Sequence, residues 1–292
     1  MTSSVAAVNG IELCYETFGD RGGRPMLLIM GLSGPMHWWD DEFCELLASR
    51  GCFVIRYDNR DCGRSTSIPG RVSPLWAMLG LGRSRSPYTL DEMADDAAGL
   101  LTHLGIDAAH VVGVSMGGMI AQTLAVRAPE RVLSLVSISS TTGSRLVGRP
   151  SAAAARLLMS APPRTRDAYL DAAVRMWRLI GSPGHPFDAD RVRRTAERTY
   201  EWGLNRSGTA RQLAAILVSG NRTRKLRSIR VPTLVIHGDA DPLIHVSGGR
   251  ATVRAIPGAE LRIYPGMGHD LPPKLWPDFA ADIVRTMDRA GQ

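Results

Sequence analysis

The chain of 292 residues is long enough for one large single-core domain with an inserted subdomain, or for two small domains. Hydrophobic residues make up 44% and charged residues 22%, which is ordinary for a globular protein and excludes a disordered or fibrous chain. The net charge of +7 would suit a nucleic-acid binder, but residues 141–230 hold 18 Lys and Arg against 6 Asp and Glu without any helix-turn-helix, aromatic reader strand or zinc motif, so we expect no nucleic-acid partner.

The sequence indicates neither export nor a metal site. Its first ten residues have no basic or long apolar region, and no later stretch of 18 residues lacks a charge or a turn former. We therefore expect a cytoplasmic protein without a transmembrane segment. The cysteines, Cys14, Cys44, Cys52 and Cys62, form no C-x-x-C pair and have no histidine at ligand spacing, so we interpret them as reduced, mostly buried thiols.

The first elements along the chain predict a sheet with helical crossovers. Residues 5–19 are typical of a hairpin around Asn9-Gly10, the pair preferred in tight type I′ turns. Apolar runs at 26–30 and 52–57 fit buried parallel strands, and the amphipathic stretch between them fits a helix. Thr89 and Glu92 have the spacing of a capping box, which begins a helix that runs to Gly105.

The second half of the chain repeats this alternation after one interruption. An apolar strand at 110–114, a helix to about 127 and a strand at 131–139 precede residues 141–230, which are helical in pattern and broken by Pro and Gly. Strands at 233–238 and 260–265 then alternate with helices near 246–255 and 273–288. This order predicts an α/β fold with a doubly wound, mostly parallel sheet, built from residues 1–140 and 231–292 and interrupted by a helical cap at 141–230.

The motif Gly113-Val114-Ser115-Met116-Gly117 matches G-x-S-x-G, directly after a strand and directly before a helix. A sharp turn of this kind holds the serine in a strained conformation and needs small residues on either side, which the glycines provide. The free N–H groups at the start of the helix favour the oxyanion that acyl transfer creates. We therefore predict Ser115 as a nucleophile and Met116 N–H as one oxyanion donor; the alternative is a Gly-rich turn without chemistry.

A serine hydroxyl needs a general base, and the base needs a carboxylate that orients it. Asp241 follows the strand at 233–238 and His269 follows the strand at 260–265, so both lie on the rim where such sheets bind ligands. We prefer Asp241 to Asp239, because Asp239 sits at the strand end and suits a turn-forming role. The turn after 26–30 predicts Leu32 N–H as the second oxyanion donor.

Six segments of the sequence together resemble the α/β-hydrolase superfamily: MLLIMGLSG, YDNRDCGRS, YTLDEMADDAAGLL, HVVGVSMGGMIAQ, VPTLVIHGDADPL and PGMGHDLP. The oxyanion turn, WWDDEF and GHPFD are similar to the aclacinomycin methylesterase-like group and to actinobacterial lipase/esterases. The resemblance implies an acyl-enzyme mechanism on carboxylic esters, carried by Ser115, Asp241 and His269 with Leu32 and Met116 at the oxyanion site, and it implies no cofactor.

The substrate pocket and the surroundings of the site are less determined. Aromatic residues at helical spacing are more often core, but we predict a pocket from Gly31, His37, Trp38, Trp39, Met159, Trp177 and Trp202. Asp61 stands where many relatives carry glycine, and the long loop 66–87 bears several large apolar side chains. We predict either a flap that joins the basic cap in docking on an anionic lipid surface, or a packed loop.

Several other functions share these residues. A thioesterase, a cofactor-free perhydrolase and a carbon-carbon hydrolase would use the same Ser, Asp and His, and only the pocket would differ. A non-catalytic lipid- or ligand-binding protein on the same scaffold would be expected to lack one of the three. An epoxide hydrolase or dehalogenase would need Asp at position 115 and is excluded. The sequence leaves the oligomeric state open.

Overall fold

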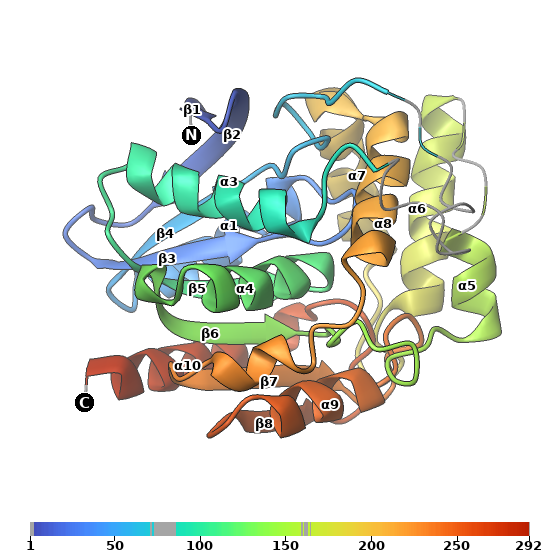
Figure 1. Ribbon diagram of the computed structural model, residues 1–292. Coiled ribbons are helices and arrows are strands. Elements are labelled where there is room, and N and C mark those ends of the chain that lie inside the picture. The colour runs from blue at the N-terminus through green and yellow to red at the C-terminus, as the bar shows by residue number, and fades with distance from the viewer. Residues whose placement is uncertain are drawn as a thin grey trace.

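Figure 1 shows a computed structural model of the chain, in which residues 3–70, 72, 86–158, 160, 163 and 165–291 are described. The described residues form an eight-stranded sheet in the order β1-β2-β4-β3-β5-β6-β7-β8. Its strands are β1 Ser4–Val8, β2 Ile11–Phe18, β3 Arg24–Ile29, β4 Cys52–Tyr57, β5 Ala109–Val114, β6 Val132–Ile138, β7 Thr233–Gly238 and β8 Glu260–Tyr264. Strand β2 is antiparallel to both of its neighbours and the other pairs are parallel, which confirms the predicted fold.

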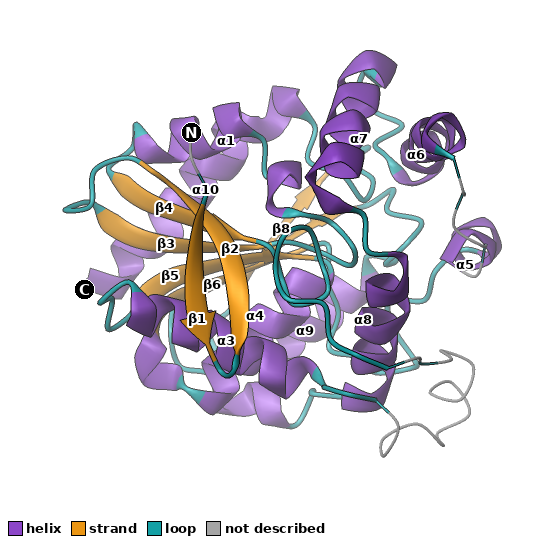
Figure 2. Ribbon diagram, turned by 90° about the horizontal axis from the view of Figure 1, so that it is seen from above, coloured by secondary structure: helices purple, strands orange, loops and turns teal. Residues whose placement is uncertain are grey.

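Helices cover both faces of this sheet (Figure 2). On one face lie α1 (Asp41–Ala48) and α10 (Trp276–Asp288), and on the other lie α3 (Leu90–His103), α4 (Met116–Arg127) and α9 (Ser247–Ala255). Neighbouring strand residues point to opposite faces, so Leu27 packs in the core on the α3 and α4 side while Leu28 packs in the core on the α1 and α10 side. Because both faces are covered, β4, β5 and β7 are buried at every position rather than at alternate ones.

The predicted local signals form where the sequence places them. Asn9 and Gly10 have φ of 49° and 76°, as the type I′ turn between β1 and β2 requires. The capping box is present at the start of α3, where Thr89 accepts a hydrogen bond from a backbone N–H and Glu92 accepts one from the Thr89 backbone. The four cysteines are free and buried, as expected.

Between β6 and β7 the chain forms α5 (Ala152–Leu158), α6 (Arg166–Ile180), α7 (Ala189–Gly203) and α8 (Arg206–Ser219). These helices lie beyond the carboxyl ends of the parallel strands, on the right in Figure 1. Leu170 and Ala173 of α6 pack with Ala196 of α7 in a small cluster of their own. The division of the chain into an α/β domain and a cap stays a prediction.

Short 3₁₀ helices complete the description: η1 Met36–Trp38, η2 Pro129–Arg131, η3 Lys225–Ser228, η4 Pro273–Leu275 and η5 Arg289–Gly291. Of the helices that the structure describes, none combines the length and the apolar character needed to cross a membrane.

Candidate active site

Ser115 occupies the sharp turn between β5 and α4. Its φ of 57° and ψ of −119° are strained for a residue with a side chain. A Cβ on Gly113 would lie 2.2 Å from the Gly117 carbonyl oxygen, and a Cβ on Gly117 would lie 2.0 Å from that of Ile29. The turn is therefore possible only because both flanking positions are glycine, as the motif predicted. Ser115 N–H donates to Ile138 O at 2.9 Å, which fastens the turn to β6.

The predicted acid and base lie beside this serine. His269 Nε2 is 3.0 Å from Ser115 Oγ, and His269 Nδ1 is 2.7 Å from Asp241 Oδ2. An ionised carboxylate only accepts hydrogen bonds, so the proton of a neutral His269 ring sits on Nδ1 and Nε2 is left to accept from the serine hydroxyl. Both partners are buried, with 6% of His269 and 3% of Asp241 exposed. The three side chains therefore form one continuous hydrogen-bonded chain.

Asp241 is held in its charged form. Its Oδ1 accepts hydrogen bonds from Leu243 N–H and Ile244 N–H, each at 2.9 Å. Burial acts to raise the pKa of this carboxyl, but the charge and the hydrogen bond of His269 outweigh burial and hold the pKa below its ordinary value. Asp239, the alternative considered from the sequence, instead accepts from Gly266 N–H at 2.7 Å and so ties the strand end to the next turn.

The loop that carries His269 is fastened to the end of α6. His269 N–H donates to Ile180 O at 2.7 Å, and Gly268 N–H donates to Ser182 Oγ at 2.8 Å. The Ser182 hydroxyl in turn donates to Asp270. The sequence did not predict a role for Ser182. This residue lies in the stretch 141–230, which contains no predicted strand from which its place relative to the sheet could be inferred. His269 is therefore held from two sides, by β8 before it and by the segment that ends α6.

Two backbone N–H groups near Ser115 are the candidate oxyanion donors. Met116 is the first residue of α4, so its N–H has no partner inside the helix. Leu32 N–H has no hydrogen-bond partner within the described part of the chain. A Cβ on Gly31 would lie 3.1 Å from Ser115 Cβ, which shows how closely this turn approaches the serine. The positive end of the α4 dipole also favours a negative charge at this position.

The residues predicted for the pocket lie in different surroundings. The Trp38 and Trp177 rings contact each other with centroids 4.8 Å apart, and this pair joins the turn after β3 to α6 beside the loop of His269. Trp39 is fully buried and stacks on Phe43, so it belongs to the core and not to a pocket. Met159 lies outside the described residues.

His37 and Trp202 take part in a contact between α7 and the loop after β4. Trp202 Nε1 donates to Asp58 Oδ2 at 2.7 Å, and the His37 ring packs edge-on against the indole with centroids 4.3 Å apart. The Asp58 carboxylate also accepts from Met36 N–H at 2.7 Å, which holds the segment after the oxyanion turn. Sequence reasoning did not assign a role to Asp58. These contacts connect the segment after β3, the loop after β4 and α7.

Asp61, noted as a departure from the usual glycine, has a φ of 67° and is buried. Its carboxylate accepts from Arg211 of α8 at 2.6 and 2.8 Å and from the Tyr88 hydroxyl at 2.6 Å. The loop after β4 is thereby ion-paired to α8. Apart from residues 66–70, 72, 86 and 87, the long loop 66–87 lies outside the described residues, and so do the apolar residues predicted for the flap, Leu75, Trp76, Met78, Leu79 and Leu81.

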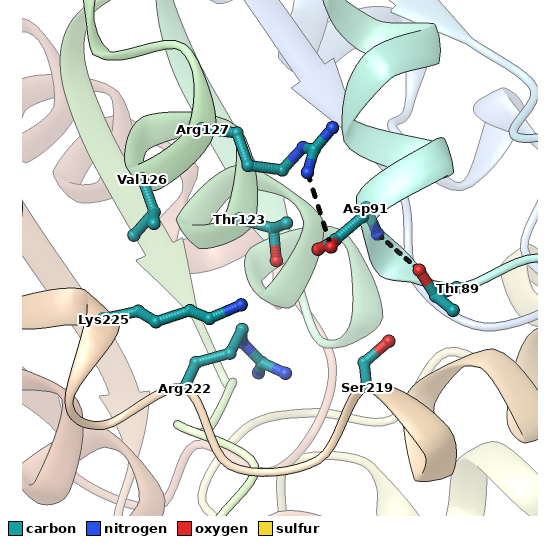
Figure 3. Close-up of a pocket in the computed structure, with 8 residues that line it drawn as sticks. All are labelled: Thr89, Asp91, Thr123, Val126, Arg127, Ser219, Arg222 and Lys225. Carbon is teal, nitrogen blue, oxygen red and sulfur yellow. Dashed lines mark hydrogen bonds and ion pairs between the residues drawn. The ribbon is translucent and has the colours of Figure 1, made fainter. Parts of the chain in front are cut away.

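A hollow elsewhere on the molecule lies between the start of α3, the second half of α4 and the segment after α8 (Figure 3). Its lining carries both charges, and Arg127 forms an ion pair with Asp91 across it at 3.4 Å. The lining residues are Thr89, Asp91, Thr123, Val126, Arg127, Ser219, Arg222 and Lys225. Because Thr123 is about two helical turns along α4 from Ser115, roughly 12 Å, this hollow is separate from the serine site.

Residues 24–273 match the model of the alpha/beta hydrolase fold family, and the chain belongs to that family. It is similar to rhodomycin D methylesterase DauP of Streptomyces sp. (strain C5), with 32% identity over 309 residues that cover 97% of each protein. This similarity confirms the narrower resemblance to the aclacinomycin methylesterase-like group. A non-heme haloperoxidase of Rhodococcus erythropolis is 29% identical over 91% of this chain and 92% of its own. The enol-lactonase of Burkholderia xenovorans LB400 shares the fold, with a TM-score of 0.73 and 23% identity over 98% of this chain and 100% of its own.

Proposed function

We propose that this protein hydrolyses carboxylic esters of hydrophobic or amphiphilic compounds through an acyl-enzyme formed on Ser115. The observation that carries the proposal is the hydrogen-bonded chain from Ser115 Oγ through His269 to Asp241, placed at the start of α4. A relative named a methylesterase supports an ester as the substrate class.

In the proposed reaction, His269 Nε2 takes the proton of Ser115 Oγ as the oxygen attacks the ester carbonyl carbon. Met116 N–H and Leu32 N–H donate to the oxyanion that results, and Asp241 stabilises the positive charge on the His269 ring. His269 then gives its proton to the leaving alcohol oxygen. Water deacylates the serine by the same route, with His269 again as base, and the carboxylic acid leaves.

The side chains beside the reacting groups support an apolar substrate. Trp38 and Trp177 offer two large, partly exposed ring surfaces on the side of the oxyanion turn. The Trp177 indole N–H is buried and has no hydrogen-bond partner in the structure. An acyl or alcohol group with an aromatic or long aliphatic part would cover these rings, and an oxygen on it would accept from the indole.

A chain-length series of p-nitrophenyl esters, methyl esters and thioesters, measured on the wild type and on Ser115→Ala, tests this function. We expect turnover of esters by the wild type and a loss of kcat of about 10⁴-fold or more in the variant. Fluorophosphonate labelling mapped to Ser115 by mass spectrometry separates an esterase from a non-catalytic binding protein. Undiminished turnover by Ser115→Ala would refute the proposal, and faster turnover of thioesters would move it to a thioesterase.

A cofactor-free perhydrolase is the second candidate, and the similarity to a protein named a haloperoxidase favours it. In that reaction, hydrogen peroxide replaces water in the attack on the acyl-enzyme, and a peracid leaves instead of the acid. The same three side chains would serve. Measuring peracid from acetate and hydrogen peroxide against ester hydrolysis, in the wild type and in Ser115→Ala, decides between the two activities.

A further inference from the structure

A buried glutamine joins α8 to two loops at the rim of the sheet. Gln212 is fully buried, its Oε1 accepts from Ser33 N–H at 2.8 Å and its Nε2 donates to Arg60 O at 2.8 Å. A backbone N–H can only donate and a carbonyl can only accept, so these two partners fix which way the amide faces. Replacing the amide by an apolar group would leave the partly buried Ser33 N–H and the buried Arg60 carbonyl without this partner.

The residue that Gln212 holds follows directly after the predicted oxyanion donor Leu32. Ser33 has a φ of 60°, which is unfavourable for a residue with a side chain and persists only where neighbours impose it. Its hydroxyl lies 2.7 Å from Thr209 Oγ1, one helical turn before Gln212 on α8. Both the backbone and the side chain of Ser33 are therefore held by the same helix.

We propose that Gln212 is a positioning residue, which sets the turn so that Leu32 N–H points at the oxyanion formed on Ser115. The proposal rests on the ester hydrolysis proposed above. Consecutive peptide groups share a Cα, so fixing the direction of Ser33 N–H and its φ limits how Leu32 N–H can turn. An N–H group without a partner is kept in place only through its neighbours, since nothing bonds to it until the oxyanion forms.

This role predicts an effect on kcat rather than on KM. The oxyanion exists in the transition state and not in the bound ester, so a misdirected donor costs rate without costing ground-state affinity. Deleting such a donor outright lowers kcat by about 10²- to 10³-fold. Loosening it through Gln212→Leu should cost less, roughly 10- to 100-fold in kcat, while KM changes by less than about threefold.

The experiment compares Gln212→Leu and Gln212→Glu with Ser207→Ala on a p-nitrophenyl ester. The Glu variant keeps an acceptor for Ser33 N–H and should recover part of the lost kcat. Ser207 is an exposed residue in the first turn of α8 whose hydroxyl donates to Asn205 Oδ1 at 3.0 Å, so Ser207→Ala changes the same helix without removing a contact to the turn and should keep the wild-type kcat. If the Leu variant does not fold, Thr209→Val, which removes only the contact to the Ser33 hydroxyl, is expected to lower kcat about threefold.

Two further measurements separate this inference from the proposed function. Hydrogen exchange of the peptide that covers residues 31–34 should be faster in Gln212→Leu than in the wild type, whatever the protein catalyses. Fluorophosphonate labelling of Ser115 should slow in parallel with kcat. No labelling of the wild type would defeat the proposed function, whereas normal labelling, normal kcat or unchanged exchange in Gln212→Leu would overturn the role of Gln212.

Discussion

Replacing Asp241 by asparagine should stop His269 from acting as a base, because it moves the ring proton from Nδ1 to Nε2. The geometry of the loop should not change. The carboxylate accepts two backbone N–H groups through Oδ1 and the His269 Nδ1 proton through Oδ2. An asparagine that keeps both backbone bonds must turn its NH₂ group toward His269. The opposite orientation would leave the buried Ile244 N–H and the partly buried Leu243 N–H unpaired, at about 1–3 kcal/mol for the buried group and less for the other, so the first orientation dominates.

The ring then has to accept at Nδ1 and carry its proton on Nε2, where it cannot take the proton of Ser115. The same substitution in the serine protease template lowers kcat by about 10⁴-fold, which corresponds to about 5.4 kcal/mol of barrier. We expect a loss of this order for Asp241→Asn. Because Asp241 acts on the reaction through His269 and does not contact the bound ester, KM for a p-nitrophenyl ester should stay within a small factor of the wild-type value.

Asp239→Asn is the matched control. Asp239 is an exposed side chain whose Oδ1 accepts from Gly266 N–H, and asparagine keeps such an acceptor. Its kcat should therefore differ from the wild type by roughly twofold at most. The reasoning fails if Asp241→Asn keeps more than a tenth of the wild-type kcat, or if Asp239→Asn is the variant that loses activity.

Three further outcomes are expected. Gly117→Ala places a Cβ 2.0 Å from a β3 carbonyl oxygen, so we expect it to lower the free energy of unfolding by about 1–3 kcal/mol or more and to abolish activity. Gly291→Ala is the control, because the space around Gly291 is open, and it should leave Tm unchanged. Burial acts to raise the pKa of Glu16, but its hydrogen bonds and the charge of Arg56 lower that pKa to about 2. Its contribution to stability is therefore complete above pH 4.5 and is lost as the pH falls toward 2, so Glu16→Gln should show a flatter decline of Tm over that range. If the basic stretch 141–230 docks on lipid, the protein should co-sediment with anionic vesicles and less so at high salt, whereas equal, weak binding to neutral vesicles would count against docking.

The elements that could be predicted are those whose signals are local. The Asn9-Gly10 turn, the capping box at Thr89 and the apolar runs each lie within a few consecutive residues, and the order of the elements then limits the topology. The boundaries were less accurate. Strand β3 begins at Arg24, which pairs with Cys52 on β4, but a polar residue at a strand end gives no apolar signal.

The site could be predicted where its residues follow strands. Ser115, Asp241 and His269 each come after the carboxyl end of a parallel strand, so the sheet alone brings them to one rim. Gln212 and Ser182 could not be found in this way. They lie on α8 and just after α6, and their place beside the rim depends on how these helices pack against distant loops, which no periodicity in the sequence encodes.

Several arginines of 141–230 form ion pairs with acidic residues outside this stretch. Arg191 pairs with Asp40 and Arg198 pairs with Asp41, so basic residues of this stretch meet acidic residues of the rest of the chain. Exposed pairs contribute about 0–1 kcal/mol each, whereas breaking a buried pair costs about 3–5 kcal/mol. The pair between Arg211 and Asp61 is buried, with 3% and 1% of these residues exposed. Of these three ion pairs it is therefore the one whose loss should cost the most stability.

That buried pair also sets the register of α8 on the loops. Arg211 directly precedes Gln212, so the contact that places the guanidinium on Asp61 places the neighbouring amide between Ser33 and Arg60. A shift of α8 by one residue would separate both contacts, because successive side chains on a helix point about 100° apart. One arginine of the basic stretch thus docks α8 on the loop after β4, and the neighbouring Gln212 connects the docked helix to the turn beside Ser115.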